Sequence, residues 1–134
     1  MNDAEVLTLV SRFERCLLAK DEFHHRDHLA VAAAYLYAGD FESALVRMRA
    51  SLTRFAAYHG VSGLYHETLT RFWLLQVEQR LDRSAPLCVS VKRVQEQLAD
   101  KELPRSYYSK AALDSPQAKM KWIEPDLRPF QQMD

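Results

Sequence analysis

The chain has 134 residues but only three glycines, Gly39, Gly60 and Gly63. Turns between β-strands commonly need glycine, because its missing side chain permits backbone conformations that other residues avoid. A β-rich chain of this length would need many more turn residues. The scarcity of glycine therefore predicts a helical fold.

Apolar residues recur three and four positions apart along most of the chain, which is the spacing of one face of a helix. The pattern predicts five helices, over about 4–20, 24–38, 41–59, 63–81 and 84–98. Residues 104–134 contain prolines that forbid a continuous helix, so we expect a strap of short helices and extended tail that buries Trp122, Leu127 and Phe130. The predicted fold is an all-α single domain, with an up-and-down bundle over 1–103 and the C-terminal strap over 104–134.

The charges exclude several classes of partner. Eighteen Lys and Arg balance eighteen Asp and Glu and are scattered along the chain, so we expect no nucleic acid and no membrane as a partner. No apolar run reaches the length of about 18 residues that a membrane span needs, and the first residues lack the pattern of a signal peptide. We therefore expect a cytoplasmic protein, in which Cys16 and Cys88 are buried free thiols.

All five histidines lie between positions 24 and 66. His25 and His28 are three residues apart at the start of the second predicted helix, so their side chains point to one side. His59 ends the third helix and His66 begins the fourth. In an up-and-down bundle these helix ends lie at one common end, so the topology predicts that the histidines meet there in a polar pocket.

Such a pocket has a chemical use, because neutral imidazoles bind divalent metals such as Zn, Fe or Ni. We expect His25, His28 and His66 as metal ligands, with Glu67 as a further ligand or as a catalytic acid or base. Tyr65 and Thr68 can supply hydroxyl groups to a bound anionic group near the helix start. On this hypothesis the chain is a metal-binding protein or a metal-dependent enzyme.

Two other functions fit the same residues. The pocket can bind a small polar or anionic molecule without any metal. Alternatively, the chain is a structural or interaction protein that forms a homodimer, and its histidines cap helices. His24 and His59 suit this capping role, and Glu67 and Arg71 have the spacing of an ordinary surface pair. The motif H-E-x-x-H of zinc proteases is absent, since no second histidine follows Glu67 at the required spacing.

Three blocks of the sequence, 23–29, 65–73 and 122–129, resemble a family of small bacterial proteins of uncharacterised activity. Members of that family read approximately W-T-H-x-x-H-L, then G-Y-H-E-T-I-T, then E-P-D-L-R-P. The resemblance extends over nearly the whole chain, and the three blocks together are more specific than any one of them. The resemblance implies that the three blocks contribute to one common site, but it implies no particular reaction.

The resemblance implies particular site residues. It selects His25 and His28 as the histidine pair, and places His24 where the family pattern has Thr. It also selects residues 65–68 and connects the segment 124–129 with the same site. The chain departs from the family at 61–64, where related sequences have a longer polar loop, so a ligand contact from that loop is not implied here.

Overall fold

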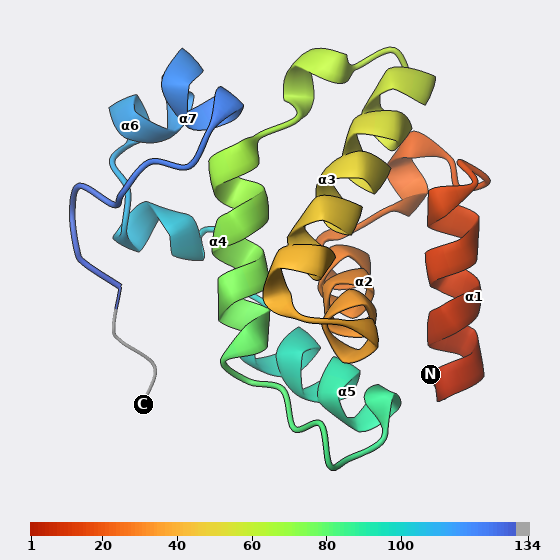
Figure 1. The fold of residues 1–134 in the computed structure, drawn as a ribbon. Helices are drawn as coiled ribbons and strands as arrows, with labels where there is room; N and C mark the ends of the chain where they lie inside the picture. Colours follow the sequence, from red (N-terminus) through yellow and green to blue (C-terminus); the bar gives the residue numbers. More distant parts are fainter. Residues whose placement is uncertain (131–134) are drawn as a thin grey trace.

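Helix α2 (His25–Ala38) is the centre of the fold. Every residue from 29 to 36 is buried, so over these two turns the helix has no face for solvent. A helix that is apolar around its whole circumference is stable only when other elements cover all its sides. In the computed structural model, helices α1, α3, α4 and α5 pack against α2 and provide this cover (Figure 1).

The structure describes residues 1–130, and within that range the chain is all-helical, as predicted. Its α helices are α1 (Asp3–Glu14), α2 (His25–Ala38), α3 (Phe41–Tyr58), α4 (Glu67–Glu78), α5 (Leu87–Gln97), α6 (Lys110–Asp114) and α7 (Pro116–Met120). Short 3-10 helices lie at Lys20–Glu22, Ser62–Leu64 and Leu103–Ser106. The all-α prediction is confirmed, whereas a simple up-and-down bundle of five helices is not. No helix among the described residues is long and apolar enough to cross a membrane.

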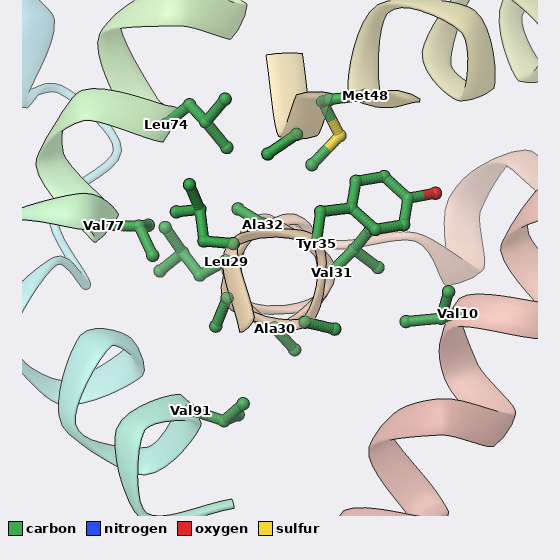
Figure 2. Packing of buried hydrophobic residues seen from close by; sticks show 14 of the residues in the cluster. Val10, Leu29, Ala30, Val31, Ala32, Tyr35, Met48, Leu74, Val77 and Val91 are labelled. Atoms are coloured by element: carbon green, nitrogen blue, oxygen red, sulfur yellow. The ribbon is translucent and has the colours of Figure 1, made fainter. Parts of the chain in front are cut away.

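The core consists of side chains that extend from α2 toward each surrounding helix. Figure 2 shows α2 end-on, with side chains from four other helices around it: Val10 from α1, Met48 from α3, Leu74 and Val77 from α4, and Val91 from α5. Each fully buried side chain of this size contributes about 1.5–3 kcal/mol to folding. The alanines of α2 leave room for its neighbours to approach.

Helix α1 ends at Glu14, earlier than the predicted end near Lys20. Cys16 has a φ of 56°, in the left-handed region that terminates a helix. The backbone N–H of Leu17 then donates to the carbonyl of Arg12, at 2.8 Å. As a result Leu17 is 51% exposed, and Leu18 enters the core in its place. Both cysteines are free, as predicted, but they are only half-buried.

The C-terminal strap lies beside α4, on the side away from α1 (Figure 1). Tyr108 is fully buried, and its hydroxyl donates to the carbonyl of Ile123 at 2.7 Å. Trp122 and Phe130 are half-buried, with their ring centroids 5.6 Å apart. Leu127 is 58% exposed, so its predicted burial is wrong. The predicted strap also included residues 131–134, which lie outside the described range.

The central position of α2 predicts that it will not accept a larger side chain. Ala30 has no exposed surface, so Ala30→Leu should overpack the core and destabilise the fold by about 1–3 kcal/mol. Ala50→Leu, on the exposed face of α3, is the matched control and should change stability by less than about 0.5 kcal/mol. Urea denaturation followed by circular dichroism measures both. Equal midpoints for the two variants would contradict the central role of α2.

Candidate ligand-binding site

A cavity of about 450 Å³ lies between the start of α2, the second half of α3 and the first half of α4. The loop between α3 and α4 and the turn before α2 complete its walls. Most of the lining is apolar and includes Leu29, Ala32, Leu52, Phe55, Leu69 and Trp73. The predicted meeting of these helix ends therefore occurs, and it encloses a space of ligand size.

The polar lining groups are few. They comprise His25, His28, Tyr65, His66 and Thr70, together with two lysines, Lys20 and Lys101. The structure thus brings the three predicted histidines and Tyr65 to one cavity. Thr70, Lys20 and Lys101 are additions that the sequence did not indicate, because the segments that carry them are brought together only by the fold.

Three histidines hold backbone carbonyl groups of distant segments. Nε2 lies 2.8 Å from the Leu98 oxygen in His25, 3.1 Å from the Leu18 oxygen in His59, and 2.7 Å from the Leu113 oxygen in His66. A carbonyl oxygen only accepts hydrogen bonds, so Nε2 is the protonated, donating nitrogen in each ring. These bonds fix the orientation of the three rings and connect the cavity walls to the rest of the chain.

His66 uses both of its ring nitrogens. Besides the bond from Nε2, its Nδ1 accepts a hydrogen bond from the backbone N–H of Leu69 at 3.2 Å, which caps the start of α4. No lone pair on this ring is left for a metal ion. The arrangement therefore does not support His66 as a metal ligand, and it gives this histidine a structural role.

His28 differs from the other lining histidines. Neither of its ring nitrogens has a hydrogen-bond partner among residues 1–130, and neither is sealed from the cavity. The ring packs on Phe23, with centroids 4.2 Å apart. Burial, and to a smaller extent the nearby His25, lower the pKa of His28 to about 4. At neutral pH His28 is thus an uncharged ring in the cavity lining, and its donor and its acceptor have no partner among the described residues.

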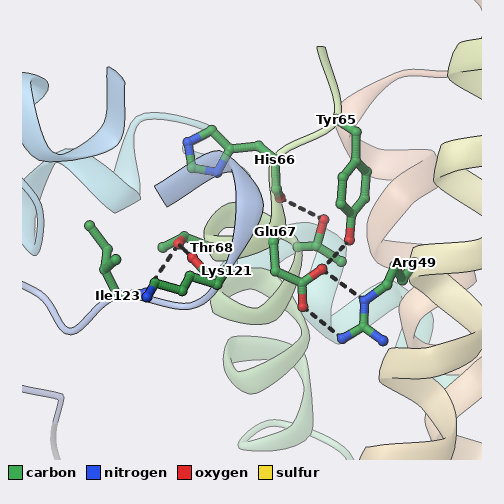
Figure 3. Close-up of polar contacts among 8 residues, drawn as sticks. Arg49, Tyr65, His66, Glu67, Thr68, Lys121 and Ile123 are labelled. Carbon is green, nitrogen blue, oxygen red and sulfur yellow. Dashed lines mark hydrogen bonds and ion pairs between the residues drawn. The ribbon is translucent and has the colours of Figure 1, made fainter. Parts of the chain in front are cut away.

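Glu67 does not line the cavity, although the sequence suggested it as an acid, base or ligand. Arg49 donates to both carboxylate oxygens, at 2.9 and 2.7 Å, and the Tyr65 hydroxyl donates to one of them at 2.6 Å (Figure 3). The hydrogen bonds from Arg49 are the main cause that lowers the pKa of Glu67. The carboxylate therefore anchors α4 to α3 and holds the Tyr65 ring in the cavity wall. Arg49 was not predicted, because nothing in its local sequence marks its distant partner.

Thr68 lies outside the cavity as well. Its hydroxyl donates to the carbonyl of Lys121 at 2.9 Å and accepts from the N–H of Ile123 at 3.3 Å (Figure 3). Its predicted role in ligand binding is thus replaced by an anchor for the C-terminal strap. His24 is exposed and precedes α2 as its N-cap residue, but its side chain forms no capping hydrogen bond, so it does not play the capping role that the sequence suggested.

The prediction of a bound metal is not supported by the geometry. Among residues 1–130, no three His, Cys, Asp or Glu side chains are grouped as a metal ion would require. The cavity contains three histidines, but hydrogen bonds to Leu98 and Leu113 direct two of the rings toward backbone oxygens. A ligand set of His25, His28 and His66 would break the hydrogen bonds of His66, which occupy both of its ring nitrogens.

Comparisons of the chain with models of protein families, with curated proteins and with solved structures gave no match. The resemblance to a bacterial family therefore stays a prediction from the sequence motifs.

The buried, uncharged state of His28 predicts a pH-dependent stability. Its pKa is about 4 in the folded chain against a usual value of 6.5, so the unfolded chain binds more protons between these values. Stability should therefore fall by about 2 kcal/mol as the pH drops from 6.5 to 4.5. His28→Gln removes the titrating group and should flatten this part of the profile. Chemical denaturation of both proteins at several pH values measures the difference, and parallel profiles would contradict it.

Proposed function

We propose that the chain binds a small, largely apolar molecule in the cavity between α2, α3 and α4. The observation that carries this proposal is the unpartnered ring of His28 in a cavity of about 450 Å³ with mainly apolar walls. A ligand that hydrogen-bonds to this ring would supply the partner that it lacks among the described residues. Pockets that bind small molecules share this pattern of apolar walls and a few polar groups.

The walls favour a ligand with an apolar body. Three aromatic rings line the cavity, those of Phe23, Phe55 and Trp73. The Trp73 ring is held in place by its contact with the ring of His25, with centroids 4.6 Å apart. Rings held in this way offer a large contact area and lose little freedom on binding. His28 then serves as the polar group that orients the ligand.

The proposal differs from the two other hypotheses in what it asks of the histidines. A metal-dependent activity needs several free ring nitrogens at one point, whereas His66 has none. A purely structural role describes His25, His59 and His66 well, since each binds a carbonyl oxygen. A purely structural role does not explain why the ring of His28 has no hydrogen-bond partner among the described residues. Ligand binding accounts for the anchored rings and for the unpartnered ring together.

Tryptophan fluorescence can test the proposal directly. The chain has two tryptophans, and only Trp73 lines the cavity, so Trp122→Phe leaves a single reporter at the site. We propose to titrate this variant with 4-phenylbutanoate, 4-phenylbutanol and 4-phenylbutylamine, which share one apolar body and differ in the polar end. At least one of them should change the fluorescence with a saturating dependence on concentration and should raise the melting temperature.

Variants that fill the cavity supply the control. Leu52→Phe from α3 and Leu69→Phe from α4 each place a larger side chain in the cavity, so each should abolish binding while the circular dichroism spectrum stays unchanged. Ala50→Leu adds bulk to the exposed face of α3 instead and should bind normally. The titration is repeated with a chelator. Binding that disappears with chelator would favour the metal hypothesis, and binding that survives both filled cavities would refute the proposed site.

A further inference from the structure

We propose that the ligand of this cavity is an organic anion, whose charged group is held between Lys20 and Lys101 where the cavity opens to solvent. The inference rests on the proposed function and specifies the charge of the ligand. Both lysines line the cavity and are exposed, so they mark its opening. They come from different parts of the chain, one before α2 and one after α5.

The charged residues of the cavity lining all have one sign, although the chain as a whole is balanced. The sequence contains eighteen basic and eighteen acidic residues. The residues that line the cavity include two lysines and no Asp or Glu. Within the lining, an anionic group thus finds two cationic partners, whereas an amine finds no carboxylate.

The neighbouring carboxylates, which include Asp21, form no direct ion pair with these lysines. Glu22 accepts a hydrogen bond from the N–H of Ala19 at 2.6 Å. Near the second lysine, Asp100 accepts from the N–H of Glu102 at 2.9 Å, and Glu102 pairs with Arg105 at 2.8 Å. Among residues 1–130, the amino groups of Lys20 and Lys101 form no ion pair or hydrogen bond. Both charges are therefore available to a ligand.

A hydrogen bond from a histidine holds the backbone near each lysine. His59 binds the carbonyl of Leu18, two residues before Lys20, and His25 binds the carbonyl of Leu98, three residues before Lys101. These bonds hold both lysines at the rim of the cavity. Only the flexible side chains have to be ordered when an anion binds, which lowers the entropic cost.

The lining gives each part of such a ligand a place. The apolar body contacts the aromatic and aliphatic walls. The neutral ring of His28 offers one N–H to an oxygen atom of the ligand. The positive charge comes from the lysines at the opening. A carboxylate attached to an aromatic or aliphatic body matches this order of groups.

The three phenylbutyl compounds also test the charge. We expect the Trp122→Phe protein to bind 4-phenylbutanoate about tenfold more tightly than 4-phenylbutanol, and the amine most weakly. Added salt should weaken binding of the acid and leave binding of the alcohol unchanged. Lys20→Gln with Lys101→Gln should remove the advantage of the acid. Lys92→Gln with Lys119→Gln is the matched control, because both lysines are exposed and neither lines the cavity.

The possible results separate the two proposals. Preference for the acid that depends on Lys20 and Lys101 supports the inference. Equal affinity for acid and alcohol, or tighter binding of the amine, overturns the inference while the cavity remains a binding site. A preference for the acid that the double variant retains also overturns it. If none of the three compounds binds, both the inference and the proposed function fail.

Discussion

The burial of α2 by four neighbouring helices is the constraint on which the rest of the structure depends. Because residues 29–36 are buried on every side, α1, α3, α4 and α5 must each contribute a face to this helix. The first turn of α2, which carries His25 and His28, is less buried than the residues that follow it. The cavity therefore lies where the packing around the central helix ends, and its walls are the ends of the helices that pack there.

The histidines of this chain serve two distinct purposes. His25, His59 and His66 each donate from Nε2 to a backbone oxygen of a distant segment, so they act as crosslinks within the fold. Such bonds between partly buried groups typically stabilise a fold by about 1 kcal/mol each. His28 lines the same cavity as His25 and His66, yet its ring has no hydrogen-bond partner among the described residues. Hydrogen bonding, rather than residue type, therefore distinguishes His28, the candidate ligand-binding residue, from the three structural histidines.

The sequence predicted the helices well because their spacing is a local property. It also placed His25, His28 and His66 around one pocket, since the ends of successive helices meet in a helical fold. The roles of the residues could not be predicted. Whether His66 can bind a ligand depends on the carbonyl of Leu113, 47 positions away, and the state of Glu67 depends on Arg49 on another helix. The early end of α1 depends on the backbone conformation of Cys16, for which no local pattern was present.

The contacts of α4 with the C-terminal strap have a consequence for the order in which the site forms during synthesis. His66 binds Leu113, and Thr68 binds Lys121 and Ile123, so the wall of the cavity is held from behind by residues translated much later. A ribosome makes the chain from its N-terminus, and every residue that lines the cavity has left it before these anchors emerge. The nascent chain can thus pack α2 early, whereas a cavity of the final shape exists only once the strap has been made.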